Sequence, residues 1–249
     1  MNIRDIGNEI TLLNSNMHIH TIFSACADRD MTLADILARA KSANLKIIAL
    51  TDHNHPGAPL LGDIRCLKNE MEKDDADIKV IFGAELSAYG IGKYSDSEEV
   101  NRQIDYRLYA CTHYNLDYWE QPRDRSPRGY ALHMLAVAHE LIKSGRADCI
   151  AHPFATAYLK KKFQDPTVVT RSVTDAELND ILKLGKERGV AWEINTNVIA
   201  RDKDFMRRYL TFGKSLGVKF YLGTDAHKLD QIDPKGFLSE ESVSKLIAE

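Results

Sequence analysis

Two histidines one residue apart lie near the start of the chain, in the stretch "NMHIHTIFSACAD" of residues 16–28. In a β-strand, side chains at positions i and i+2 leave the same face, so His18 and His20 would point in one direction. Neutral imidazole is a common metal ligand, so two imidazoles aimed at one small volume suit a metal ion. The alternative is a strand that exposes both histidines to solvent, and this stretch alone does not decide between the two interpretations.

Most of the other histidines also fall where an apolar run ends. Seven of the nine histidines lie at such positions, together with several carboxylates, whereas chance placement would scatter them over helices and loops. The polar side chains at the ends of the apolar runs are His18, His20, Asp52, His53, His55, Glu85, His113, His152, Glu193, Asn195, Asp225 and His227. Converging imidazoles and carboxylates need partners when they are buried, and divalent cations would satisfy them. The mixed nitrogen and oxygen donors exceed one tetrahedral site and predict two or three zinc, manganese or iron ions.

Some of these polar residues have a simpler interpretation. His133 and His139 lie inside a helical stretch, so we expect packing or surface roles for them. Asp52 is expected to orient a neighbouring histidine, because a ligating imidazole usually donates its other N–H to a carboxylate or carbonyl. His55 precedes a proline and is expected to lie in a loop behind the ligands, and the role of Glu193 stays open.

The elements that must position these side chains alternate between short apolar runs and longer helical stretches. Continuous apolar runs are typical of parallel strands covered on both faces, and we expect strands at 15–20, 45–51, 78–86, 106–113, 148–153, 190–196 and 218–224. We expect helices at 32–44, 129–145, 174–189, 202–216 and 239–248. Capping patterns of the S/T-x-x-D/E type begin the helices at Thr32 and Thr174. Irregular connections are expected at about 88–104, 114–128 and 153–172. The alternation predicts an α/β fold with a parallel sheet, either closed as a barrel or open.

Length and composition limit the possible functions. The chain has 249 residues, of which 44% are hydrophobic and 28% charged, as is usual for a globular protein with a substantial core. A formal net charge of −3 gives no electrostatic reason to expect a stable nucleic-acid complex, and no apolar stretch is long enough to span a membrane. The four cysteines show no C-x-x-C pair, which predicts a reducing, cytoplasmic setting. We find no linker and expect one domain over residues 1–249.

The ordered set of motifs resembles the PHP family, which comprises polymerase-associated and histidinol-phosphatase-type phosphoesterases. The motifs are H-x-H-T near the N-terminus, T-D-H, G-x-E, a histidine at a strand end, A-H-P and D-A-H, and they extend from about residue 16 to 228. Each motif alone is weak, but their order is specific. The resemblance implies a distorted seven-stranded β/α barrel with a trinuclear metal site at its C-terminal rim.

The resemblance also implies which residues hold the metal ions. The ligands carried over are His18, His20, Glu85 and Asp225 for one ion, Glu85 and His53 for a second, and His113, His152 and His227 for a third. The family commonly has Asp or His shortly after H-x-H, where this chain has Cys26 and Asp28. We expect Asp28 to be this ligand because an oxygen donor fits the remaining set, while a Cys26 thiolate stays open. The segment "EINTNVIAR" resembles the histidinol-phosphatase branch and makes Arg201 a candidate for binding the substrate phosphate.

The expected activity is hydrolysis of a small phosphate ester, with inorganic phosphate as product. A metal-bound hydroxide would attack phosphorus, Asp225 would orient it, and His227 or a nearby acid such as His55 would protonate the leaving oxygen. Further basic candidates for the phosphate are Arg123, Arg125, Arg128 and the lysines 160–162. The alternatives are an amidohydrolase-like enzyme that attacks a carbonyl and a non-catalytic regulator that binds metal or nucleotide. The identity of the substrate, the metals and the oligomeric state stay open.

Overall fold

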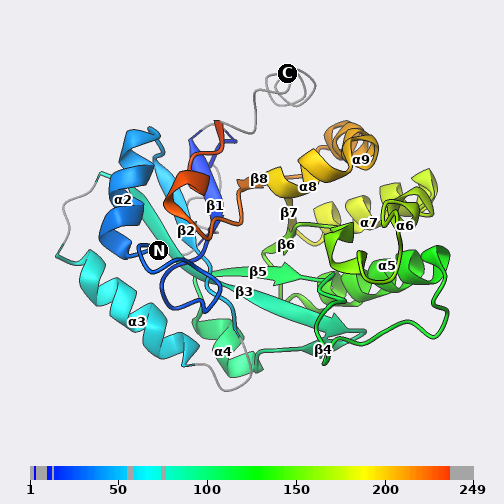
Figure 1. Ribbon diagram of the computed structural model, residues 1–249, viewed down its shortest axis with the longest axis horizontal. Coiled ribbons are helices and arrows are strands. Elements are labelled where there is room, and N and C mark those ends of the chain that lie inside the picture. Colours follow the sequence, from blue (N-terminus) through cyan, green and yellow to red (C-terminus); the bar gives the residue numbers. More distant parts are fainter. Residues whose placement is uncertain (1–2, 4–9, 13, 55–58, 74–76, 236–249) are drawn as a thin grey trace. The chain divides into compact units, whose positions relative to one another are not determined.

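The chain adopts an α/β fold of the TIM-like type (Figure 1). The structure is a computed structural model, and it describes residues 3, 10–12, 14–54, 59–73 and 77–235. Seven strands follow one another in the order β1-β2-β3-β5-β6-β7-β8, and a short strand β4 pairs with β3. The strands are β1 (Ser15–Ile19), β2 (Ile47–Leu50), β3 (Lys79–Gly90), β4 (Lys93–Tyr94), β5 (Tyr106–Ala110), β6 (Cys149–Ala151), β7 (Ala191–Asn195) and β8 (Phe220–Gly223). This parallel α/β arrangement confirms the fold class predicted from the sequence.

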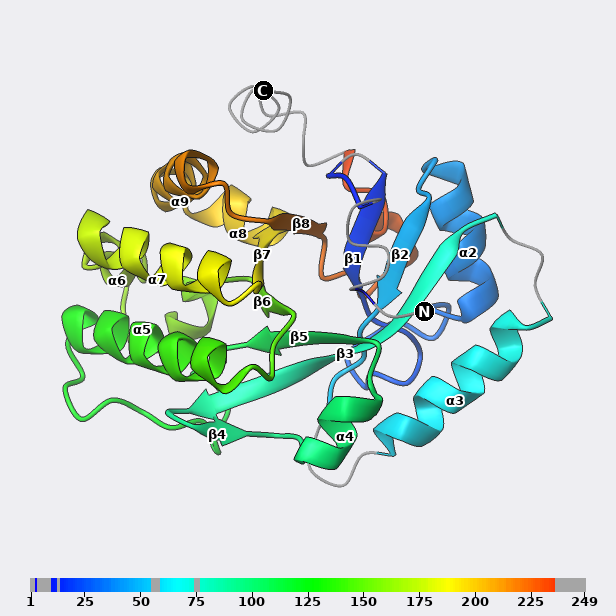
Figure 2. The ribbon, with the colours of Figure 1, turned by 180° about the vertical axis from the view of Figure 1, so that it is seen from behind.

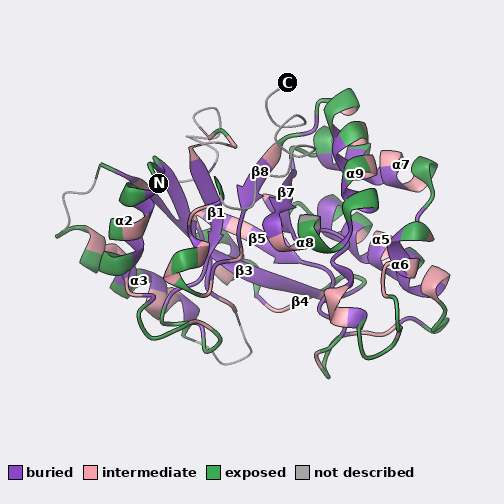
Figure 3. Ribbon diagram, turned by 45° about the horizontal axis from the view of Figure 1, so that its top comes forward, coloured by how far each residue is buried: buried purple, intermediate pink, exposed green. Residues whose placement is uncertain are grey.

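The helices connect consecutive strands. They are α2 (Leu33–Ser42), α3 (Leu60–Met71), α4 (Glu98–Gln103), α5 (Pro127–Ser144), α6 (Val168–Arg171), α7 (Asp175–Glu187), α8 (Thr196–Arg201) and α9 (Lys203–Leu216), with short 3-10 turns at Thr156–Leu159 and Leu229–Gln231. The strands are almost entirely buried, whereas helices such as α2, α3, α7 and α9 carry many exposed positions (Figure 3). Among the described residues, no helix is both long and apolar enough to cross a membrane.

Contacts between residues divide the chain into two compact units. The first unit comprises Met1–Glu85, Asp96–Leu108 and Tyr221–Glu249, and the second comprises Leu86–Ser95 and Tyr109–Phe220. We describe each unit by itself. The prediction of one domain over residues 1–249 stays a prediction.

In the first unit, strands from distant parts of the sequence lie side by side. The pairs β1–β2 and β2–β3 are parallel, and these three strands and helices α2 and α3 are visible together in Figure 1. A parallel bridge joins Ile19, at the end of β1, to Ala226, which follows β8. The side-chain amide of Asn16 donates hydrogen bonds to Thr224 Oγ1 at 2.7 Å and to the carbonyl of Ile232 at 2.9 Å. The residues after β8 are therefore fixed against β1.

Helix α2 of the first unit forms where the capping pattern predicts it. The Thr32 hydroxyl accepts a hydrogen bond from the backbone N–H of Asp35, which supplies a partner for one of the free donors at the helix start. The helix buries one face through Leu33, Ile36 and Leu37, the spacing expected of an amphipathic helix.

The second unit contains the helices α5, α6, α7, α8 and α9, which are visible together with β6 and β7 in Figure 2. Helix α7 begins with a complete capping box, in which Thr174 and Glu177 each satisfy a backbone N–H of the other. The Arg128 guanidinium of α5 donates two parallel hydrogen bonds to the Glu177 carboxylate, at 2.6 and 2.7 Å. Gly185 lets α7 approach β7 closely, because a Cβ at this position would collide with the indole of Trp192.

All seven strands predicted from the sequence are present, and four of the five predicted helices are found as α2, α5, α7 and α9. The fifth predicted helix, 239–248, lies outside the described residues. The prediction of an irregular stretch at 88–104 is wrong. Strand β3 continues to Gly90 and pairs with β4 across a turn, and helix α4 follows. Helix α8 and the short helix α6 were also not predicted; each is too short to show a clear helical period.

Candidate metal centre

Two imidazoles at the end of β1 lie beside the carboxylates of Glu85, in β3, and Asp225, after β8, and form a largely buried cluster in the first unit. The Nε2 atoms of His18 and His20 lie 3.2 Å apart. Asp225 Oδ1 lies 3.3 Å from the first and 3.0 Å from the second, and Glu85 Oε2 lies 3.5 Å from both. The ligand atoms of these four residues are all within 4.8 Å of one another. Two ring nitrogens and two carboxylate oxygens at these distances form a donor set that a divalent transition metal can bind.

Whether this cluster can bind a cation depends on which ring nitrogen of His20 carries the proton. Asp52 can only accept, so the Ser24 hydroxyl donates its proton to Asp52 Oδ1 at 2.5 Å. Ser24 Oγ then accepts from Nδ1–H of His20 at 3.1 Å. With its proton on Nδ1, His20 presents the lone pair of Nε2 to the cluster. This is the arrangement that a metal-binding imidazole needs.

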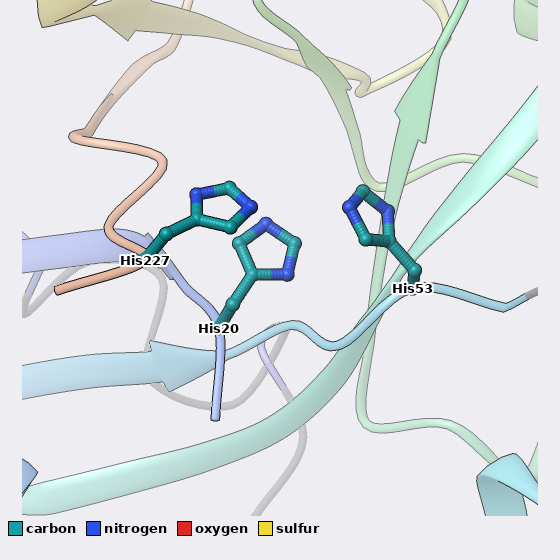
Figure 4. A group of neighbouring side chains, drawn as sticks. All are labelled: His20, His53 and His227. Carbon is teal, nitrogen blue, oxygen red and sulfur yellow. The ribbon is translucent and has the colours of Figure 1, made fainter. Parts of the chain in front are cut away.

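The end of β2 and the segment after β8 add two more imidazoles of the first unit. His20, His53 and His227 come from three segments, and their rings lie close together in Figure 4. The ring centroids of His20 and His227 are 4.2 Å apart, and those of His20 and His53 are 4.4 Å apart. Nδ1 of His227 donates to the backbone carbonyl of Asp225 at 2.8 Å, which leaves Nε2 as the ring atom available for a ligand. The ligand atoms of the three histidines also lie within 4.8 Å of one another.

The charges of the first unit's cluster are strongly coupled. Burial lowers the pKa of His20 to about 4, against the raising effect of Asp225, so this imidazole is neutral at pH 7. Burial acts in the same direction on His53, but the Glu85 carboxylate 3.0 Å from its Nδ1 raises the pKa to about 10. Burial would raise the pKa of Asp225, yet the neighbouring His18 and His20 hold it far below its usual range. The carboxylates of the cluster thus require positive charge beside them, which a proton or a metal ion can supply.

Beside the histidines of Figure 4 lies the thiol of Cys26. Burial alone would raise its pKa, but hydrogen bonds to the imidazoles of His227 and His53 lower it to about 6. Asp28 has different surroundings, since its carboxylate lies 3.3 Å from Lys228 Nζ and its side chain is 51% exposed. The prediction that Asp28 is a ligand stays a prediction.

Backbone strain marks two of the proposed ligands, His152 with a φ of 26° and Asp225. Asp225 has a φ of 54°, in the left-handed region that residues other than glycine rarely adopt. Such a conformation costs free energy and persists where the surroundings require it, often at functional sites. Here the hydrogen bonds of Ala226 to β1 hold the backbone on either side, with its N–H donating to His18 and its carbonyl accepting from His20.

The second unit places two further predicted ligands next to each other. The rings of His113, after β5, and His152, after β6, have centroids 5.0 Å apart, and Tyr158 contacts both rings. The Glu193 carboxylate accepts a hydrogen bond from the backbone N–H of His152. Glu193 therefore positions the end of β6. The assignment of His113, His152 and His227 to one ion stays a prediction, because it joins residues of both units.

The remaining candidates from the sequence fall into two groups. His133 is buried and hydrogen bonds to Tyr114 at 2.8 Å, and His139 is exposed beside Glu140, so the packing and surface roles expected for them are confirmed. Arg128 is engaged by Glu177, and Arg125 by Gln121 and Tyr130. His55 lies outside the described residues.

Two residues that hold the cluster together were not identified from the sequence. Thr21 donates to Asp52 through both its backbone N–H and its hydroxyl, each at 2.7 Å, and Ser24 connects Asp52 to His20. Asp52 does orient a histidine, as expected, but it does so through Ser24 rather than by direct contact. Serine and threonine are common in loops, and the signal that could have indicated these two is their closeness to H-x-H, with Thr21 directly after it and Ser24 four residues after His20.

A family model described as "PHP domain" matches residues 16–197, well over half of the chain. The chain belongs to the PHP domain family. A "probable phosphatase" from Vibrio campbellii is 27% identical over 92% of this chain and 83% of its own length. Another from Aliivibrio fischeri is 24% identical over 86% of this chain and 78% of its own length.

Two solved structures have a similar fold. A histidinol phosphate phosphatase from Lactococcus lactis, complexed with zinc, L-histidinol and phosphate, superimposes with a TM-score of 0.64 at 18% identity and covers 95% of this chain and 94% of its own. A histidinol phosphatase from Listeria monocytogenes, described as putative, gives 0.56 at 12% identity and covers 88% of this chain and 97% of its own. At these identities the likeness concerns the fold. Family, phosphatase relatives and clusters of potential ligands together make the PHP protein a metal-dependent phosphoesterase.

Proposed function

We propose that the protein hydrolyses a small phosphate ester with two to three zinc, manganese or iron ions and releases inorganic phosphate. The observation that carries this proposal is the buried cluster of His18, His20, Glu85 and Asp225, whose ligand atoms lie within 4.8 Å of one another. We assign these four residues to one ion. A second ion would bind between Glu85 and His53, and the ligands of a third would be His113, His152 and His227.

Bound divalent ions would lower the pKa of water toward neutrality and stabilise negative charge on the phosphoryl oxygens. The chain's own residues have separate tasks. Asp225 Oδ1, held by its strained backbone, would accept a hydrogen bond from the attacking water and orient it. The Asp52–Ser24 pair would keep the proton of His20 on Nδ1, so that Nε2 stays available throughout the reaction.

His227 has one ring nitrogen left for chemistry. Since its Nδ1–H is donated to the carbonyl of Asp225, only Nε2 can bind an ion or transfer a proton. The two tasks exclude each other at any one moment. We propose that His227 donates a proton to the leaving oxygen only when its Nε2 carries a proton instead of an ion.

Arg201 is our candidate for binding the phosphate group. It ends helix α8, its side chain is exposed, and no hydrogen bond or ion pair to another described residue engages its guanidinium. The planar guanidinium can hold two phosphate oxygens at once. The histidinol and phosphate in the Lactococcus lactis enzyme support a small phosphate monoester as the substrate class, and histidinol phosphate is one member to test.

The proposal is tested by a screen of phosphate esters. Purified protein supplied with Zn²⁺, Mn²⁺ or Fe²⁺ is expected to hydrolyse p-nitrophenyl phosphate and at least one of histidinol phosphate, nucleoside monophosphates and sugar phosphates. His18→Ala should lose bound metal and most activity, whereas His139→Ala, an exposed histidine on α5, should keep both. Arg201→Ala should keep its metal and lower kcat/KM by about 10- to 150-fold, the equivalent of one or two charge-assisted hydrogen bonds. Absence of hydrolysis with every metal and ester, or full activity of His18→Ala, would contradict the proposal.

A further inference from the structure

The loop after β1 offers two possible ligands, and the structure gives them different surroundings. The backbone N–H of Asp28 donates to the carbonyl of His227 at 2.9 Å. Its carboxylate, however, lies 3.3 Å from the ammonium of Lys228. Neither Asp28 nor Cys26 belongs to the groups of clustered ligand atoms found among the described residues, so their other contacts distinguish them. The Asp28 backbone thus anchors the loop, while its side chain pairs with a lysine.

Cys26 has the opposite arrangement. Its thiol hydrogen bonds to the imidazoles of both His53 and His227. These two histidines, with His20, form the group whose ligand atoms lie within 4.8 Å of one another. Cys26 is nevertheless exposed, so that an ion from solution can reach its sulfur.

The loop around Cys26 is held on both sides. Before it, the Ser24 hydroxyl is bound to Asp52 at 2.5 Å, and the N–H of Ala27 donates to the Ser24 carbonyl at 2.9 Å. After it, the Asp28 backbone is bound to His227. The position of the thiol beside the two imidazoles therefore follows from an anchored backbone.

We propose that the Cys26 sulfur, and not the Asp28 carboxylate, completes a metal site formed with His53 and His227, so that His227 binds the second ion together with His53 rather than the third ion. This inference rests on the proposed metal-dependent function. On binding, the protons held by Cys26 and by the coordinating ring nitrogens of the imidazoles pass to solvent, and the thiolate sulfur coordinates the ion together with neutral imidazole nitrogens.

A sulfur ligand changes which metal this position prefers. Thiolate and imidazole donors favour Zn²⁺ and related borderline or soft ions, whereas carboxylate oxygens suit Mn²⁺ and Mg²⁺. With Cys26 as ligand, the site of His53 and His227 should bind Zn²⁺ or Co²⁺ and discriminate against Mn²⁺. The cluster of His18, His20, Glu85 and Asp225 contains no sulfur and should discriminate less.

Cobalt substitution provides a test that does not depend on activity. A Co²⁺–thiolate bond produces a charge-transfer absorption in the near ultraviolet, which Co²⁺ bound only by nitrogen and oxygen lacks. The protein loaded with Co²⁺ should show this band, and so should Asp28→Asn and Cys66→Ser. Cys66 is an exposed cysteine on α3 and serves as the matched control. Cys26→Ser should lose the band and bind one of its Co²⁺ ions at least tenfold more weakly.

A second variant separates loss of the ligand from damage to the loop. Cys26→Asp replaces the sulfur by a carboxylate oxygen, and we expect it to recover the number of bound ions without recovering the band. Retention of the band and of every ion in Cys26→Ser, with loss of an ion in Asp28→Asn, would overturn the inference. If Cys26→Ser also hydrolyses phosphate esters normally, the inference about Cys26 fails but the proposed function stands. Wild-type protein that binds no Co²⁺ and hydrolyses no ester would overturn both.

Discussion

At the scale of single residues, proton positions prepare this site as much as the ligands do. His20 can bind an ion through Nε2 because its proton is held on Nδ1, and that proton is held because Asp52 orders the Ser24 hydroxyl. The same Ser24 oxygen accepts the backbone N–H of His53 at 3.3 Å. One hydroxyl therefore orients two of the proposed metal ligands.

Replacement of Ser24 tests this relay. Ser24→Ala removes the acceptor of the His20 proton and leaves Asp52 without one of its donors. Outer partners of this kind typically contribute 10- to 100-fold to metal affinity, and we expect a loss of this size for Zn²⁺. Titration against a competing chelator measures it. Ser42→Ala, at an exposed position on α2, is the control, and equal affinities of the two variants would show that the relay is not needed.

The sequence indicated the residues of the His18, His20, Glu85 and Asp225 cluster better than it indicated the residues that orient them. Histidines such as His18 and His20 could be recognised because strand periodicity alone dictates that positions i and i+2 share a face. The role of Ser24 depends on a contact with Asp52, 28 residues further along the chain, and no local pattern encodes that contact. The choice between Cys26 and Asp28 likewise depends on where one loop is anchored.

At the scale of elements, one residue at the contact between α5 and α7 takes part both in a helix cap and in an ion pair. Glu177 closes the capping box of α7 and at the same time binds the Arg128 guanidinium of α5. The hydrogen bonds from Arg128, strengthened by the backbone N–H of Thr174 and opposed by partial burial, lower the pKa of Glu177 from 4.5 to about 2. The start of α7 therefore depends on an ionised carboxylate.

This coupling predicts a pH-dependent stability. The pKa of Glu177 is lower in the folded protein, so its contribution is complete above about pH 4.5 and is lost as the pH falls toward about 2. Glu177→Gln keeps an oxygen for the capping box but removes the charge. Since Arg128 is 43% exposed, solvent screening limits the expected loss of unfolding free energy at pH 7 to about 1 kcal/mol.

Urea denaturation across this pH range measures the effect. The difference between wild type and Glu177→Gln should shrink steadily from pH 4.5 to 2. Glu187→Gln on the same helix is the control, because its partner Lys183 is 4.0 Å away and both side chains are exposed, so its effect should be a few tenths of a kcal/mol. A difference between wild type and Glu177→Gln that does not change with pH would contradict the assignment.

The elements themselves follow from local patterns more fully than their connections do. The caps at Thr32 and Thr174 predicted the beginnings of α2 and α7, because an N-cap is a short-range arrangement. The extension of β3 to Gly90 was not predicted, since it depends on pairing with β4 across a turn. Helix α3 was not predicted from the sequence, although it is longer than α4 or α8.

At the scale of the whole molecule, bound metal should contribute to stability as well as to activity. An ion bound only by the folded chain stabilises it by about 2.7 kcal/mol when free metal is 100 times its dissociation constant. For a chain of this size, that corresponds to roughly 5–10 °C in the unfolding temperature for each ion. Chelation with EDTA should lower Tm by this amount or more, and added Zn²⁺ should restore it.

Calorimetry on matched samples checks the expected shift. His18→Ala, which removes a ligand from the buried cluster, should respond less to the chelator than the wild type. His139→Ala should respond as the wild type does. An unfolding temperature unchanged by EDTA, in a sample shown by elemental analysis to have lost its metal, would contradict a stabilising metal centre.

The pairing of β1 with the residues after β8 has a consequence for the order of events during synthesis. The imidazoles of His18 and His20 leave the ribosome early, whereas Asp225, the carboxylate beside them, lies more than 200 residues later in the chain. At translation rates of 5–20 residues per second, this separation corresponds to roughly 10–40 s. During that time the N-terminal histidines have no Asp225 and no Ala226 backbone to hold them. A complete cluster of His18, His20, Glu85 and Asp225 therefore forms only in chains translated beyond Asp225.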